Sequence, residues 1–105
     1  MKVLWGVTYT IDGIKGVLKE GGSARKAVAQ KLVESVGGTL EAFYFAYGKN
    51  DVYVIADLPD NAAAVSAALQ VTAAGGAKVT TTVLLTPEEF DAAVGKSVDY
   101  RPPGA

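Results

Sequence analysis

Cysteine and histidine are both absent from this sequence. Their absence excludes disulfides, thiol nucleophiles, Ser-His-Asp triads, and every metal or haem site that depends on a histidine or cysteine ligand. Cation sites can also be built from oxygen ligands alone, but the carboxylates of this chain do not have the spacing that such sites need. We therefore expect neither a metal site nor a bound cofactor.

Basic runs and long apolar runs are lacking too. Ten basic and eleven acidic residues give a net charge of −1, and they are dispersed, so no segment is basic enough to follow a phosphate backbone. No apolar segment reaches the roughly 18 residues of a membrane-spanning helix. The first residues, Met1–Gly6, turn polar too soon for a signal peptide. We expect no nucleic-acid partner, no membrane association and a cytoplasmic protein of bacterial type.

Apolar residues, by contrast, are abundant. They make up half of the chain, and the mean hydropathy is +0.22. A length of 105 residues fits a single domain, residues 1–105. A domain of this size leaves much of its surface exposed, so this composition places apolar side chains there. We expect a homodimer or a higher homo-oligomer in which a second copy covers them.

Alternation, capping signals and glycine pairs divide the chain into strands and helices. Residues Lys2–Tyr9 alternate between an apolar side and a mixed side, as a strand does. Thr86-Pro87-Glu88-Glu89 has the cap and the early proline of a helix start. The expected strands are 2–9, 39–47, 51–58 and 77–85. The expected helices run from 10 to about 19, from 23 to 36, from 61 to the glycines at 75–76, and from 86 to about 96. Residues 98–105 are expected to form an extended tail.

This element order is the βαββαβ pattern of an α+β, ferredoxin-like fold. Right-handed crossovers give an antiparallel four-stranded sheet of order 4-1-3-2, with the helices on one face and a short C-terminal helix added. Each long helix should turn an apolar stripe toward the sheet. The expected stripes are Ala24, Val28, Leu32 and Val36 in the first, and Ala62, Val65, Ala68, Leu69 and Thr72 in the second.

The other face of the sheet carries no helix, and a second copy is expected to cover it. Alternation places Val3, Trp5, Val7 and Tyr9 on the helix side, with Trp5 as a core residue. Tyrosines, threonines and small residues remain for the open face. Two such faces packed together would enclose a partly wet cavity for a small apolar or planar ligand. Its expected lining is Thr8, Tyr44, Asp51, Tyr53, Lys78, Thr80 and Thr82.

Several of these residues have two open interpretations. Asp51 is either a general base or an acceptor of backbone N–H groups in the hairpin turn. The tyrosines are either pocket lining or ordinary interface residues. Lys78 and the two threonines either bind an anion or guard an edge strand. Asn50 is expected in a left-handed turn conformation.

Another candidate is the helix start at Gly21-Gly22-Ser23. It precedes Arg25 and Lys26, which makes an anion site plausible there. The segment lacks the spacing of a P-loop or of a dinucleotide fingerprint, so no nucleotide is expected.

Nearly the whole chain resembles the GYD family. The resemblance rests on the order and spacing of five segments: Thr10–Lys15, Tyr44-Phe45, Gly48-x-x-Asp51-Val52, Leu58-Pro59-Asp60 and Thr86–Phe90. It implies a dimeric α/β barrel of ferredoxin-like subunits and identifies no reaction. The chain departs from the family pattern at Asn50, which stands where the family has its name-giving tyrosine.

Three functions fit these observations. The first is a dimeric module that binds a small molecule between its sheets. The second is a cofactor-free monooxygenase or isomerase, by analogy with related barrels; here Tyr44, Asp51, Tyr53 or Lys78 would carry protons, although general bases near neutral pH are most often histidines. The third is a structural protein that forms rings or shells.

Overall fold

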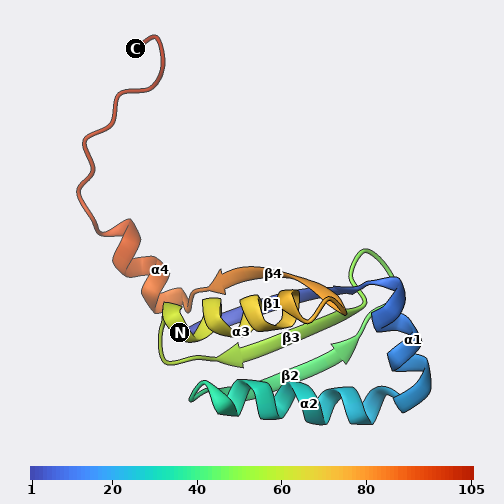
Figure 1. The fold of residues 1–105 in the computed structure, drawn as a ribbon. Coiled ribbons are helices and arrows are strands. Elements are labelled where there is room, and N and C mark those ends of the chain that lie inside the picture. Colours follow the sequence, from blue (N-terminus) through green and yellow to red (C-terminus); the bar gives the residue numbers. More distant parts are fainter.

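A computed structural model describes residues 1–105 of the protein as one α+β body with a projecting C-terminal arm (Figure 1). The strands are β1 (Lys2–Tyr9), β2 (Thr39–Phe45), β3 (Val52–Asp57) and β4 (Ala77–Leu84). The helices are α1 (Ile11–Glu20), α2 (Gly22–Ser35), α3 (Asn61–Ala73) and α4 (Pro87–Val94). The expected elements are all present, with bounds close to those expected.

The four strands form one antiparallel sheet of order β2-β3-β1-β4. This is the expected 4-1-3-2 order written from the opposite edge, so the predicted ferredoxin-like topology is confirmed. β1 pairs along its whole length with β4, from Lys2 opposite Leu84 to Tyr9 opposite Ala77. A register shift between Leu40 and Ala42 marks the one irregularity, a bulge in β2.

Both long helices pack on one face of the sheet, above opposite edges. α2 lies over β2 and α3 lies over β4. Val33 of α2 and Ala67 of α3 belong to the same buried cluster as Trp5 of β1 and Val54 of β3, which places both helices on one side. The other side has no covering element within the chain, as expected.

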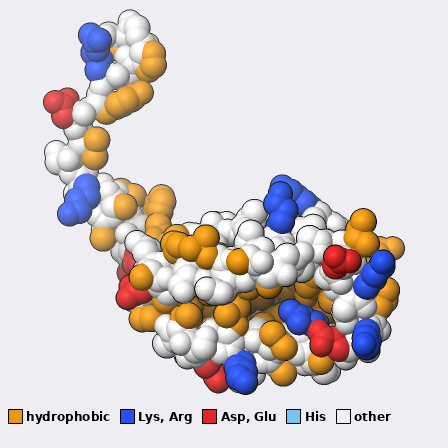
Figure 2. Space-filling model, viewed as in Figure 1, with side chains coloured by type: hydrophobic (Ala, Val, Ile, Leu, Met, Phe, Trp, Pro, Cys, Tyr) orange, Lys and Arg blue, Asp and Glu red, His pale blue; other side chains and the backbone are white.

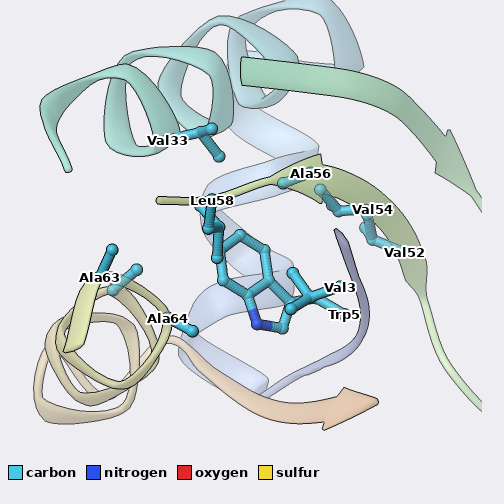
Figure 3. Packing of buried hydrophobic residues seen from close by; sticks show 10 residues of the cluster. Val3, Trp5, Val33, Val52, Val54, Ala56, Leu58, Ala63 and Ala64 are labelled. Atoms are coloured by element: carbon cyan, nitrogen blue, oxygen red, sulfur yellow. The ribbon is translucent and has the colours of Figure 1, made fainter. Parts of the chain in front are cut away.

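Trp5 lies at the centre of the core, between the sheet and the helices (Figure 3). Its side chain is 5% exposed, and its indole Nε1 donates a hydrogen bond to Thr81 Oγ1 at 2.9 Å. The predicted core role of Trp5 is therefore confirmed. The core is nevertheless small, because only 12 of the 105 residues are buried.

The stripe predicted for α3 is mostly wrong, because only Ala68 of its five residues is half-buried. Val65 and Leu69 are 56% and 63% exposed, whereas the buried residues are Ala63, Ala64 and Ala67. The helix itself carries apolar residues on nearly all of its sides, so periodicity alone could not identify its inner face. Three alanines let the helix backbone come close to the sheet, and the larger side chains are left outside.

The stripe predicted for α2 is only partly correct. Leu32 and Val36 are half-buried, but Val28 is exposed. The one fully buried residue of this helix is Val33, which was not predicted. The inner side of α2 borders a half-open cavity between α2 and α3, so few of its residues are completely covered.

The C-terminal arm consists of α4 and the residues after it. α4 begins with the predicted capping box, in which Thr86 and Glu89 each accept from the other's backbone N–H. These hydrogen bonds to Thr86 lower the pKa of the Glu89 carboxyl. Residues 98–102 form no helix or strand, and the chain ends in a turn in which the Ala105 N–H donates to the Pro102 carbonyl at 3.1 Å, so the tail is not extended throughout. The tail points away from the body and does not follow its surface as had been expected (Figure 1).

The start of α1 lies against the loop between α3 and β4. Thr10 caps the helix and donates through Oγ1 to the Gly75 carbonyl at 2.9 Å, while its backbone N–H donates to the Gly76 carbonyl at 3.0 Å. Gly13 faces the same carbonyl so closely that a Cβ atom there would collide with the Gly76 oxygen. The absence of a side chain at Gly13 therefore permits this contact.

We predict that Gly13→Ala lowers the free energy of unfolding by about 1–3 kcal/mol, because α1 or the loop must move to relieve the collision. The matched control is Gly16→Ala in the same helix, where an added Cβ would meet nothing within 4 Å. This control should stabilise the protein by up to about 1 kcal/mol, since alanine favours helix. Urea denaturation measures both, and equal effects of the two substitutions would contradict the assignment.

Candidate functional site

The open face of the sheet gathers six of the seven predicted site residues. Thr8 of β1 lies opposite Lys78 of β4, and Tyr44 of β2 lies opposite Tyr53 of β3. Thr80 and Thr82 continue the face along β4. The seventh residue, Asp51, is in the loop between β2 and β3.

Apolar side chains occupy the same face. Leu4 pairs with Ile55 across β1 and β3, and Ala42 of β2 lies opposite Ile55 on its other side. Leu4 and Ile55 are half-buried although no element of the chain covers them. The face therefore combines an apolar area with a polar area toward the loop end of the sheet.

The polar area is a hydrogen-bonded cluster around Asn50. The Asn50 amide Nδ2 donates to the Tyr53 hydroxyl at 3.0 Å, and the Thr8 hydroxyl donates to Asn50 Oδ1 at 3.2 Å. Thr80 Oγ1 donates to the Gly6 carbonyl at 3.3 Å beside them. We call these residues the Asn50 cluster: Gly6, Thr8, Asn50, Tyr53 and Thr80.

Gly6 makes room for this cluster. A Cβ at this position would lie 3.0 Å from both Asn50 Nδ2 and Thr80 Oγ1. The Asn50 side chain therefore reaches across the bare backbone of the central strand. A glycine inside a strand often marks such a close approach, and this signal in the sequence was not used above to predict the cluster.

The prediction of a left-handed Asn50 is wrong, because no residue other than glycine has a positive φ. β2 ends at Phe45 and β3 begins at Val52, so the connection spans residues 46–51 and is longer than the predicted three-residue turn. A longer loop needs no left-handed residue at position 50. Asn50 instead contributes its side chain to the open face.

Asp51 holds this loop to the end of β1. Its carboxylate Oδ2 accepts from the Tyr9 backbone N–H at 2.8 Å, and its own N–H donates to the Val7 carbonyl at 2.8 Å. The backbone-acceptor interpretation of Asp51 thus has a direct counterpart in the structure, although the donor lies on the neighbouring strand and not within the turn.

The Asn50 cluster can donate hydrogen bonds to a ligand. The Tyr53 oxygen accepts from Asn50, and a phenol has one proton of its own to donate, so that proton is free for an acceptor outside the chain. Such linked hydrogen bonds polarise one another. Lys78, which is exposed and in no ion pair, adds a positive charge next to Thr8.

No group of three or more acidic side chains lies close enough together to hold a metal ion. None of the helices has the length and apolar character needed to cross a membrane.

Comparison with known proteins agrees with the fold. The sequence matches the profile of the GYD domain over residues 4–94, which is nearly the whole body of the structure. The protein therefore belongs to the GYD domain family, as its resemblance implied. No curated protein and no solved structure matches the chain.

We predict that Asp51→Ala destabilises the protein by about 1–3 kcal/mol, because the Tyr9 N–H loses its acceptor. Asp51→Asn should lose less, since an amide oxygen can still accept. Exchange of the Tyr9 amide proton, followed by NMR, should speed up in the alanine variant before other amides of β1. Unchanged exchange at Tyr9 would rule out the anchoring role.

Proposed function

We propose that the protein is a homodimeric binding module in which the open faces of two copies pack together and enclose a small ligand. The observation that carries this proposal is the Asn50 cluster, a set of linked hydrogen-bond donors placed beside an uncovered apolar area. A packed interface alone has no use for a free phenol proton. A binding pocket, in contrast, uses such a hydrogen-bond donor to orient its ligand.

Self-association is supported by how little apolar surface a single chain buries. Twelve buried residues are few for a chain of 105, and large apolar side chains remain exposed on both the body and the arm. Antiparallel sheets tolerate one face in water when that face is polar. Here Leu4, Ile55 and Tyr44 make it substantially apolar, which favours contact with a second sheet.

The chemistry of the face favours a small, planar or apolar ligand with an oxygen acceptor. Tyr44 and Tyr53 are 72% and 37% exposed and lie opposite each other, so their rings offer a flat surface. The Tyr53 hydroxyl and the Lys78 ammonium supply donors to a carbonyl or an anionic oxygen. A cofactor-free enzyme ranks lower, because Asp51, one of the candidate proton carriers, already accepts from the Tyr9 N–H.

A structural role is the second candidate, and the C-terminal arm favours it. Phe90, Val94, Val98 and Tyr100 are 59%, 69%, 78% and 71% exposed on a segment that extends from the body (Figure 2). An arm with this many uncovered apolar side chains is suited to packing on another copy. Assemblies larger than a dimer would follow if the arm and the open face bind different neighbours.

Native mass spectrometry of the purified protein tests the proposal. We expect a dimer that carries additional small-molecule mass and releases it on activation. Tyr53→Ala should remain a dimer but retain at least about tenfold less of this mass, since it loses a hydrogen bond and a stacking surface. Tyr47→Ala is the control, because Tyr47 is fully exposed in the loop and should not matter. A Tyr53→Ala protein that no longer assembles would show that the residue is interface packing and that no pocket exists there.

A further inference from the structure

A second candidate site lies on the opposite side of the sheet, between α2 and α3. The space-filling view shows a hollow there with apolar side chains in its depth (Figure 2). The hollow is a half-open cavity of about 100 Å³, lined by 16 residues of which 15 are hydrophobic. Trp5 and Val54 belong to its floor, Leu32 to one wall and Val71 to the other.

The positions of the two helices explain this cavity. Because α2 lies over β2 and α3 over β4, the central strands β1 and β3 are not fully covered. Small residues widen the gap: Ala29 faces it from α2, and Ala67 and Ala68 face it from α3. Larger side chains at these three positions would fill the space.

Arg25 is the only charged residue among those that line the cavity. Its Nη1 donates to Glu20 Oε1 at 3.0 Å, but its Nε is buried and has no hydrogen-bond partner. A buried donor on a charged group without an acceptor is costly. Burial lowers the pKa of Arg25, but its interactions with Glu20 and Tyr9 outweigh this effect and raise the pKa above its ordinary value. A permanent positive charge with an unused donor therefore borders an apolar cavity.

We propose that this cavity binds a small apolar carboxylate, whose ring or chain lies against Trp5 and Leu32 and whose carboxylate pairs with the Arg25 guanidinium at the edge of the cavity. The guanidinium suits a carboxylate because its N–H groups match the two oxygens in one plane. A neutral apolar ligand would leave Glu20 as the one acceptor of the Arg25 guanidinium. This site lies on the helix side of the sheet and does not depend on the function proposed for the open face.

The size of the cavity limits the ligand. A buried apolar cavity of about 150 Å³ is enough to hold benzene, so this half-open cavity of about 100 Å³ can enclose most of one aromatic ring or of a chain of similar bulk, with the rest of the ligand in its opening. Benzoate and hexanoate are therefore suitable probes. Benzyl alcohol and hexanol have the same apolar parts without the charge.

The full-length protein should be titrated with these four compounds by calorimetry and by fluorescence. Trp5 is the only tryptophan and part of the cavity floor, so its emission reports on this site. We expect both carboxylates to bind with saturation and to shift Trp5 emission. Arg25→Gln should weaken carboxylate binding roughly 10- to 100-fold and change alcohol binding by no more than about twofold.

Two further variants separate the site from general effects. Lys26→Gln removes the neighbouring exposed charge, which is not part of the cavity, and should leave all four affinities unchanged. Ala68→Leu should fill the cavity and weaken carboxylates and alcohols alike. The proposal is overturned if neither carboxylate binds, or if Arg25→Gln binds both as tightly as the unmodified protein. It is also overturned if Trp5 emission depends on protein concentration and not on ligand, because a segment of a second copy would then occupy the cavity.

Discussion

The alternation of side chains along β1 is the constraint on which the rest of the structure depends. β1 is paired on both edges, with β3 on one side and β4 on the other, so its register is fixed over its whole length. Trp5 must then face the helices and Gly6 must face the opposite side. The bulky Trp5 is buried at the centre of the core, and the missing side chain of Gly6 leaves room for Asn50. Both candidate sites begin from these adjacent residues.

The two faces of the sheet differ in chemistry. The helix side is almost entirely apolar, with a single guanidinium at the edge of its cavity. The open side has hydroxyls, an amide and an ammonium beside Leu4 and Ile55. Asn50 lies at the centre of the polar side chains on the open side. An amide there links Thr8 to Tyr53, a pairing that uses both its donor and its acceptor.

The topology could be predicted from the sequence because its signals are local. A helix follows each of Thr10, Asp60 and Thr86. The side chain of each accepts a hydrogen bond from the backbone N–H three residues later. The alternation of β1 likewise assigned Trp5 to the core. These features depend only on neighbours within a few residues, so one sequence is sufficient to find them.

The inner face of α3 and the sites could be predicted less well, because both depend on distant neighbours. α3 is apolar on nearly all sides, so only its distance from the sheet selects Ala64 and Ala67 over Leu69. Asn50 reaches Thr8 across 42 residues of sequence. The cavity near Arg25 results from two helices above opposite edges, and no motif in the sequence reports that separation.

The proposed binding module requires that a second copy covers the open face. Sedimentation velocity over a range of concentrations tests this claim with two variants of similar chemistry. Ile55→Lys places a charge on the open face, and Leu69→Lys places one on the exposed side of α3. We expect the unmodified protein and Leu69→Lys to sediment as dimers or larger assemblies, and Ile55→Lys to sediment as a monomer. A monomeric unmodified protein, or an Ile55→Lys variant that assembles normally, would contradict the proposal.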